Sequence, residues 1–349
     1  MTPNVLAVRS DSAGDVLLAG PAIRALAAGS RRLTLLCGPA GRAAAELLPG
    51  VDEVTCHEVP WIAPQPQSVD REALSGVVDE IERRRFDEAV IFTSFHQSAL
   101  PMALLLRLAR IPRVSAISDD YPGSLLDVRH RTGADLHEVD RNLSLAEAAG
   151  FPLAAGDDRR LRVLRGVAMP AALDGWSPYI VVHPGTSVPA RAWAPARHAE
   201  LVRLLAERGR KVVVTGSTEE RTLTRAVAGP PRSGVLDLGG AVDLAQLAEV
   251  LAGAEAVVVG NTGPAHLAGA VGTPVVSLFA PTVPPARWRP WMVPCELLVR
   301  EQAPCADTRV TVCPFPGHPC LDSITPDEVL AAVERLAPIG SAAGASVPL

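Results

Sequence analysis

Short apolar runs rich in valine, leucine and alanine alternate along the chain with longer segments whose apolar residues recur at helical spacing. Uninterrupted apolar runs are typical of parallel strands buried on both faces, and helices connect such strands. The pattern therefore predicts an α/β fold built from two series of strands and helices. The expected strands lie near residues 4–9, 33–37, 88–93, 179–182, 211–215, 235–238, 255–259 and 274–279. The expected helices lie near residues 15–28, 71–84, 97–109, 195–208, 218–228, 243–252 and 263–271.

The two series predict two domains, in agreement with a length of 349 residues, which exceeds what one core usually supports. Pro170 and Gly175 interrupt the pattern between the series. We expect one Rossmann-like, doubly wound domain over residues 1–170 and another over residues 171–325, facing each other across a cleft. Ligands of such sheets bind beyond the carboxyl ends of the strands, so the informative residues should lie in loops that follow strands.

The end of the chain contains one further helix and a tail. Thr325 and Glu328 have the spacing of a capping box at the start of a helix over residues 326–338. This helix could cross back to the N-terminal domain. Residues 339–349 are rich in alanine, glycine and serine and are expected to be flexible.

Composition narrows the class of protein. With 48% hydrophobic and 20% charged residues the chain is not intrinsically disordered, and a net charge of -5 gives no reason to expect nucleic-acid binding. No run approaches 18 apolar residues without a charge, and the first residues lack a signal-peptide pattern. We therefore expect a cytoplasmic protein with at most peripheral membrane contact.

A polar loop that ends in a carboxylate follows the first predicted strand. It reads Arg9-Ser10-Asp11-Ser12-Ala13-Gly14-Asp15 and has neither a P-loop nor a G-x-G-x-x-G pattern. Asp15 can cap the following helix. It can also act as a general base that faces a ligand at the sheet edge. The two interpretations are compatible.

Two loops of the second series have the composition of a phosphate site. His183-Pro184-Gly185-Thr186-Ser187 with nearby Arg191 offers hydroxyls, N–H groups and a cation, although such a loop can also be a plain connection. Gly260-Asn261-Thr262-Gly263-Pro264-Ala265-His266 places a helix N-terminus after a strand, which favours an anion such as pyrophosphate. His266 can reach that ligand or pack internally.

Several short motifs occur in a fixed order over residues 4 to about 335. They are Gly14-Asp15-Val16 with Pro21, His137-Glu138-Val139-Asp140-Arg141-Asn142-Leu143, His183-Pro184-Gly185, Arg191-Ala192-Trp193, Asn261-Thr262-Gly263-Pro264-Ala265-His266-Leu267, Gly272-Thr273-Pro274 and the segment from Cys313 to Pro326. Together they resemble glycosyltransferase family 9, the heptosyltransferases of the lipopolysaccharide inner core. The resemblance implies the GT-B fold and an ADP-heptose type of donor held mainly by the C-terminal domain. It implies no metal and no cofactor.

The resemblance also implies roles for individual residues. Asp15 would deprotonate the acceptor hydroxyl for an inverting, single-displacement attack. The other implied contacts are with the diphosphate (Thr186, Ser187, Arg191, Thr262, Gly263 and His266), the nucleoside (Glu220 and Val242) and the sugar (Asn261). Fixed donors of this kind can stabilise a departing diphosphate without a metal ion.

Three departures from the family pattern matter. Arg191, in a chain with the single lysine Lys211, stands where the family usually has lysine, and Asn261 stands where it often has aspartate. Arginine retains the charge and adds a bidentate fork, so phosphate binding should survive. The acceptor region shows Asp119 and Asp120 where the family commonly has basic residues. The acceptor is therefore either a lipopolysaccharide core or a neutral or cationic small molecule.

Three alternatives remain to be weighed. Cys305, Cys313, Cys320 and His318 could be taken for a zinc cluster, but the spacing C-x7-C-x6-C fits no common zinc site. A sugar-nucleotide epimerase or hydrolase would need acid and base residues on both faces of the sugar, and only Asp15 is convincing. A non-catalytic sugar-nucleotide-binding protein would not need Asp15 at all.

Overall fold

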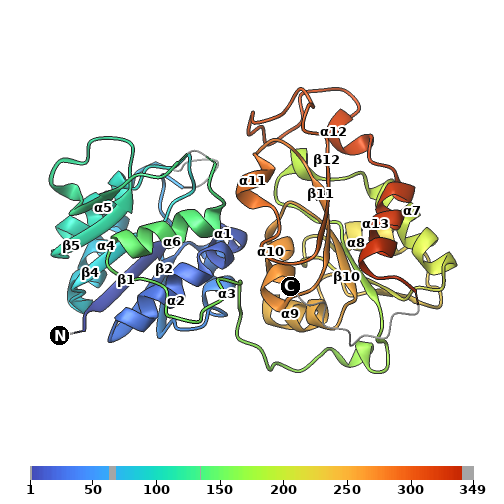
Figure 1. Ribbon diagram of the computed structural model, residues 1–349, viewed down its shortest axis with the longest axis horizontal. Helices are drawn as coiled ribbons and strands as arrows, with labels where there is room; N and C mark the ends of the chain where they lie inside the picture. Colours follow the sequence, from blue (N-terminus) through green and yellow to red (C-terminus); the bar gives the residue numbers. More distant parts are fainter. Residues whose placement is uncertain (1, 63–67, 134, 340–349) are drawn as a thin grey trace. The chain divides into compact units, whose positions relative to one another are not determined.

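The computed structural model describes residues 2–62, 68–133 and 135–339, and the chain forms two compact units that divide between Leu164 and Arg165. The division lies slightly before the expected boundary at residue 170. Each unit contains one six-stranded parallel sheet, so the predicted α/β class with two doubly wound sheets is confirmed. Apart from residue 339, the predicted tail lies outside the described residues (Figure 1).

The first unit contains a sheet in the order β3-β2-β1-β4-β5-β6, which is the Rossmann order. Its strands are β1 (Asn4–Arg9), β2 (Arg32–Cys37), β3 (Glu53–Cys56), β4 (Glu88–Ile91), β5 (Arg113–Ile117) and β6 (Val128–His130). Its helices are α1 (Ala13–Leu18), α2 (Gly20–Gly29), α3 (Arg42–Ala45), α4 (Arg71–Arg84), α5 (Leu100–Leu108) and α6 (Glu138–Ala148).

Helices cover both faces of this first sheet. Leu6 and Val8 of β1 belong to an apolar cluster with residues of α4 and α5, among them Ile81 and Leu106. Because side chains alternate along a strand, Val5 and Ala7 point to the other face, where α2 packs against α6. Both sets of β1 side chains are buried, as the uninterrupted apolar run predicts.

The single helix expected over residues 15–28 is in fact two helices. Ala19 ends α1 and precedes α2, with Pro21 at the start of α2. Proline has no N–H to donate to the preceding turn, and its ring clashes with that turn's carbonyl group. The break keeps α1 short and leaves Asp15 in its first turn.

The second unit repeats the same topology with the order β12-β11-β10-β7-β8-β9. Its strands are β7 (Ile180–His183), β8 (Val212–Val214), β9 (Val235–Asp237), β10 (Ala256–Gly260), β11 (Val275–Phe279) and β12 (Cys295–Val299). Its helices are α7 (Pro195–Glu207), α8 (Arg221–Ala228), α9 (Leu244–Ala252), α10 (Gly263–Val271), α11 (Pro285–Trp288), α12 (Pro319–Asp322) and α13 (Pro326–Leu336).

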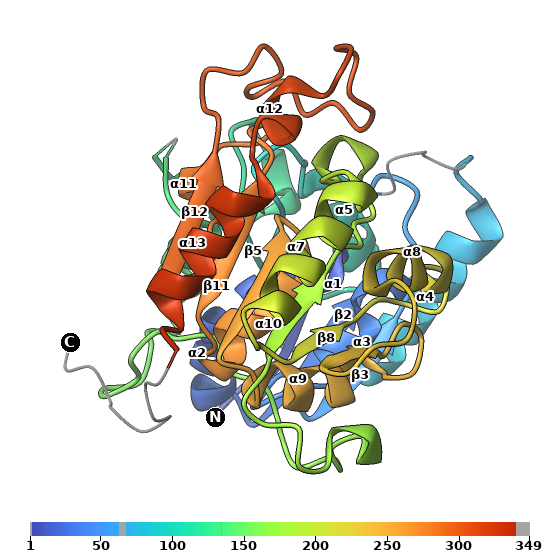
Figure 2. The ribbon, with the colours of Figure 1, turned by 90° about the vertical axis from the view of Figure 1, so that its right-hand side faces the viewer.

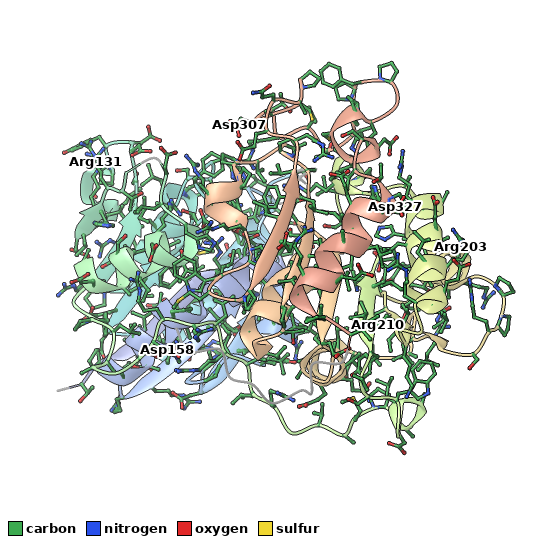
Figure 3. The ribbon with its side chains drawn as sticks, turned by 45° about the vertical axis from the view of Figure 1, so that its right-hand side comes forward. Arg131, Asp158, Arg203, Arg210, Asp307 and Asp327 are labelled. Carbon is green, nitrogen blue, oxygen red and sulfur yellow. The ribbon has the colours of Figure 1, made fainter. Side chains whose placement is uncertain are left out.

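The last helix, α13, belongs to the second unit and not to the first, contrary to the crossing considered from the sequence. Val329 and Val333 lie in the apolar cluster that joins α7 and α8 to the sheet, and Figure 2 shows α13, α7 and α8 on the same face. The outer sides of these helices carry exposed charges such as Arg203 and Asp327 (Figure 3). The predicted capping box is present, since Thr325 Oγ1 accepts a hydrogen bond from the Glu328 amide at 3.2 Å.

Four strands, β3, β5, β6 and β12, were not among the expected ones. Three of them, β3, β6 and β12, are edge strands and only partly buried, so their apolar pattern is weak. The fourth, β5, is internal but contains Arg113 and Ser115 among its five residues. Across the described residues, every helix is too short or too polar to traverse a lipid bilayer.

Candidate active site

The strand order fixes where a ligand can bind in each unit. The order reverses between β1 and β4 in the first sheet and between β7 and β10 in the second. In open parallel sheets such a switch point leaves a crevice at the carboxyl ends of the two strands. The loops singled out from the sequence follow β1, β7 and β10, so the structure places them at these points.

Asp15 lies in the first turn of α1, directly after β1, and its side chain is 20% exposed. Arg9 Nη2 is 3.2 Å from its Oδ1 atom, and the Ser12 hydroxyl donates to its Oδ2 atom at 2.8 Å. Ser12, not Asp15, is the N-cap residue of α1. The interpretation of Asp15 as the cap is therefore wrong, and its carboxylate is held in place by its neighbours while remaining open to solvent.

A buried cluster of charges surrounds this carboxylate. The fully buried Arg9 Nη2 atom also lies 3.0 Å from Asp11 Oδ2 and 3.6 Å from Glu138 Oε2, and it donates to Ser94 Oγ at 3.0 Å. Ser94 in turn donates to Asp11 at 2.9 Å. β1, α1, α6 and the loop after β4 thus supply one connected network.

Burial dominates the electrostatics of this cluster. It raises the pKa of Asp11 above its ordinary value, against the opposing effect of Arg9. Burial likewise raises the pKa of Glu138, whose nearest cations are Arg9 and Arg141. Carboxylates with pKa values shifted by desolvation and by charged neighbours are typical of functional sites.

The sequence interpretation assigned no role to Arg9, Asp11, Ser94 or Glu138. One signal was available for Arg9, because a charged residue at the end of a buried strand must have partners. Ser94 and Glu138 are 85 and well over 100 residues away from Arg9 along the chain. Only the parallel pairing of β1 with β4 and the packing of α6 bring them together.

The loop after β7 carries the predicted diphosphate residues Thr186, Ser187 and Arg191. Thr186 Oγ1 accepts a hydrogen bond from the Val188 amide at 3.2 Å, while Ser187 is exposed. Arg191 ends a short 3-10 turn, and its carbonyl oxygen lies 3.4 Å from the position that a Cβ atom on Gly260 would take. The loops after β7 and β10 therefore approach each other closely, as the predicted phosphate site requires.

Glu220, the predicted ribose contact, lies over the same loop. Its Oε2 atom accepts a hydrogen bond from the Ser217 amide at 2.8 Å. A Cβ atom on Gly185 would be 2.1 Å from its Oε1 atom, so Gly185 is required for this close approach. Val242, the predicted adenine contact, is half-buried after β9, immediately before the capping box of α9. Both residues thus lie at the carboxyl end of the sheet.

The Gly185→Ala substitution should displace the Glu220 carboxylate. We expect a loss of about 1 kcal/mol in the free energy of unfolding, because the end of this flexible side chain can move aside but gives up its hydrogen bond from the Ser217 amide. Chemical denaturation of the variant measures this loss. Gly76→Ala is the matched control, since a Cβ atom at Gly76 meets no atom within 4 Å. The double variant Gly185→Ala/Glu220→Ala should recover part of the loss, and additive losses in the two variants would contradict the overlap.

His183 and His198 are buried neutral groups of the second unit. Burial lowers the pKa of His183 to about 4 and that of His198 to about 3. The ring of His183 is within 3.0 Å of Thr215 Oγ1 through Nδ1, which ties the end of β7 to the end of β8. His198 packs edge-on against Trp193 at a centroid distance of 4.7 Å. The contact of His183 orients the ends of β7 and β8, and that of His198 holds Trp193 against α7. Neither contact points to a role in ligand binding.

The N-terminus of α10 offers fewer amides than expected. The N–H of Thr262, predicted to bind the diphosphate, donates to the Gly260 carbonyl oxygen at 2.9 Å, and Pro264 has no N–H. The Thr262 side chain makes no capping hydrogen bond. Gly263 is the first residue of α10, and His266 is buried within its first turn. Of the groups predicted to bind the diphosphate here, the Thr262 hydroxyl and the Gly263 amide therefore remain as candidate donors.

Asn261 is buried between the ends of β10 and β11. Its Oδ1 atom accepts a hydrogen bond from the Ala280 amide at 3.2 Å, and its Nδ2 atom donates to the Ala280 carbonyl oxygen at 3.4 Å. An aspartate could not make the second of these bonds. The predicted contact of Asn261 with the sugar therefore has to coexist with this structural role.

A long loop after β12 crosses the same edge of the second sheet. Its Arg309 amide donates to the Thr282 carbonyl oxygen at 2.9 Å, and its Thr311 carbonyl accepts from the Ala190 amide at 2.9 Å. His318 contacts the Ala190 carbonyl oxygen through Nε2 at 3.0 Å. Asp307 of this loop is labelled in Figure 3. The loop thus packs against the segments that follow β7 and β11.

The cysteines of this region are free thiols in the structure. Cys305 and Cys320 are buried in the apolar cluster of the second unit. Burial raises the pKa of Cys320 to about 12, with a further contribution from Cys305. In the part of the chain that the structure describes, no group of three or more histidine, cysteine or carboxylate side chains is arranged to hold a metal ion.

Comparison with known proteins places this chain among glycosyltransferases. It is 39% identical to lipopolysaccharide heptosyltransferase 1 of Pseudomonas aeruginosa over 153 residues, which is 42% of this chain and only 41% of that relative. The fold matches E. coli ADP-heptose lipopolysaccharide heptosyltransferase II with a TM-score of 0.71 at 20% identity, covering 96% of this chain and 98% of that one.

A further structural match is more distant. The E. coli glycosyltransferase TibC, described as iron-containing and dodecameric, has a TM-score of 0.52 at 16% identity, covering 96% of this chain and 76% of that chain. The model of glycosyltransferase family 9 (heptosyltransferase) matches residues 78–318, which is more than half of the sequence. The chain therefore belongs to glycosyltransferase family 9, as its motifs predicted.

Proposed function

We propose that this protein is an inverting, metal-independent glycosyltransferase that moves a heptose or a related sugar from an ADP-sugar to an acceptor hydroxyl. The observation that carries the proposal is the Asp15 carboxylate, which is held by Arg9 and Ser12 at the switch point of the first sheet and remains partly exposed. Similarity to a heptosyltransferase of Pseudomonas aeruginosa supports heptose as the transferred sugar. The E. coli ADP-heptose enzyme with this fold supports an ADP-sugar as the donor.

The chemistry follows from one base and one leaving group. Asp15 takes the proton of the acceptor hydroxyl, whose oxygen forms a bond to the anomeric carbon of the donor sugar. The bond from that carbon to the diphosphate breaks, and its electron pair leaves with ADP. A single displacement inverts the configuration at the anomeric carbon.

The second unit would hold the leaving group. Arg191 can neutralise charge on the diphosphate, and the Thr186 and Ser187 hydroxyls and the Gly263 amide can donate to its oxygens. His266 would lie near the same group. Glu220 and Val242 would hold the nucleoside, and Asn261 the sugar.

For the acceptor, the exposed charges of the first unit favour a neutral or cationic small molecule over a phosphorylated lipopolysaccharide core. Asp119 and Asp120 are exposed in the loop after β5, and the adjacent Tyr121 is 85% exposed. Carboxylates there would repel phosphate groups and attract amines. Efficient turnover of a phosphorylated core oligosaccharide by the purified protein would contradict this choice.

Donor identity can be tested by thermal unfolding. A ligand that binds only the native state stabilises it and so raises the melting temperature. At a ligand concentration a hundredfold above Kd the stabilisation is about 2.7 kcal/mol. We expect ADP and ADP-heptose to raise it and UDP, GDP and TDP to leave it nearly unchanged. A larger shift with UDP or TDP would reject the ADP donor.

Metal independence is tested in the same preparation. Transfer should persist after dialysis against EDTA. Loss of transfer that is restored by one added metal ion would reject this part of the proposal.

We also propose that the protein works in the cytoplasm, where nucleotide sugars are made. Fractionation of cells that express the protein tests this.

A further inference from the structure

The cluster around Arg9 contains more carboxylates than the Nη2 atom of Arg9 can donate hydrogen bonds to. All the contacts that Arg9 makes with Asp11, Asp15, Glu138 and Ser94 involve the Nη2 atom, which carries only two hydrogen atoms. Ser94, Asp11 and Asp15 are the three nearest partners, at 3.0, 3.0 and 3.2 Å. Glu138, at 3.6 Å, is the most distant of the three carboxylates from this atom.

Among the described residues Glu138 makes only two long ion-pair contacts, one with Arg9 and one with Arg141. Its side chain is 0% exposed, and neither of its carboxyl oxygens has a hydrogen-bond partner. Arg141 Nη1 is 3.8 Å away and already donates to the Thr93 carbonyl oxygen. Burial without a hydrogen bond favours the neutral acid over the ionised carboxylate, against the opposing effect of these two arginines.

The three carboxylates differ in what holds them. Asp11 receives a hydrogen bond from Ser94, and Asp15 receives one from Ser12 and is partly exposed to water. The charged groups that face Glu138 are Arg9, Arg141, Asp15 and Asp11. Of these carboxylates Glu138 gains most from remaining protonated, because it alone is fully buried and without a hydrogen bond.

We propose that Glu138 is a positioning residue for Asp15: it is uncharged while Asp15 acts as the base, and its ionisation at higher pH draws Arg9 away from Asp15 and slows sugar transfer. The effect on rate rests on the proposed function of Asp15. The coupling of the two carboxylates through Arg9 does not, and it can be measured without any substrate.

The test is a titration of side-chain carboxyl groups by carbon-13 NMR on the full chain, with Glu138→Gln used for assignment. We expect Glu138 to titrate above the ordinary glutamate value of about 4.3. The Asp15 signal should show a second inflection at the same pH, and Glu138→Gln should abolish it. The control is Glu147→Gln, an exposed position on the same helix, which should leave both signals unchanged.

Stability provides a second readout. Since the pKa of Glu138 is raised on folding, the wild-type protein loses stability as the pH rises through that value. Glu138→Gln should therefore melt at a higher temperature than the wild type at alkaline pH and at a similar temperature at acidic pH. Titration of Glu138 at its ordinary value, or an Asp15 signal with the same single inflection in both proteins, would overturn the proposal.

The rate is measured as hydrolysis of ADP-heptose by water, which needs no identified acceptor. The wild-type rate should fall on the alkaline side, and the rate of Glu138→Gln should stay level with KM for the donor unchanged. The same alkaline fall in both proteins would overturn the positioning role. If neither protein releases ADP while the coupled inflection is present, the proposed function fails and the coupling stands.

Discussion

Asp15→Asn should lower kcat for sugar transfer by about 10²–10⁴-fold, the usual contribution of a general base. The amide cannot accept the proton of the acceptor hydroxyl, but it preserves the size of the side chain and can still accept the hydrogen bond from Ser12. Binding of the donor should be unchanged, because the predicted donor residues lie in the other unit. Steady-state kinetics and calorimetry with ADP-heptose measure the two quantities separately.

A suitable control is Ser12→Ala, which removes a helix cap and one partner of Asp15 but keeps the base. It should cost about 1 kcal/mol of stability and far less activity than Asp15→Asn. An Asp15→Asn protein that transfers sugar at an undiminished rate would reject the mechanism. It would also revive the alternative in which the chain only binds a nucleotide sugar.

Arg191→Gln should weaken binding of ADP and ADP-heptose by about 10- to 100-fold. A hydrogen bond to a charged group contributes about 1.5–3 kcal/mol, and each 1.4 kcal/mol changes the affinity about tenfold. Arg191 is half-buried, and its backbone lies beside Gly260 at the switch point of the second sheet. Calorimetric titration with ADP measures the change.

Arg191→Lys separates charge from geometry. Lysine retains the charge without the bidentate fork, so we expect it to recover most of the affinity lost in Arg191→Gln. The control is Arg203→Gln, on the exposed side of α7, which should leave ADP binding unchanged (Figure 3). Equal affinity of the wild type and Arg191→Gln for ADP would remove Arg191 from the diphosphate site.

Much of the fold could be predicted because most central strands of the sheets are short, apolar on both faces and followed by a helix, β5 being the exception. The run Val257-Val258-Val259 and the capping box at Thr325 are signals of this local kind. The edge strands β3, β6 and β12 were not predicted, because half-buried positions have no fixed pattern of hydrophobicity. The break between α1 and α2 at Ala19 was not predicted, because the helical pattern of apolar residues continues through Pro21.

The candidate site was predictable only in part. Position after a strand was enough to place Asp15, Arg191 and Gly263 at the carboxyl ends of the sheets, since loops after parallel strands meet at one edge. Which atoms are free to bind a ligand was not predictable. The Thr262 amide and the Asn261 side chain are engaged by Gly260 and Ala280, and nothing in the local sequence indicates those bonds.

The sequence was sufficient to predict the two series of strands and helices, the loops in which the candidate site residues lie, and the family. These depend on local periodicity and on motifs read in order. The surroundings of Asp15 could not be predicted in this way, because Arg9, Ser94 and Glu138 come from distant segments. The pairing of β1 with β4 and the packing of α6 bring these groups within the range of hydrogen bonds and charge interactions in a buried site. Their charge states then depend on one another rather than on their neighbours in the chain.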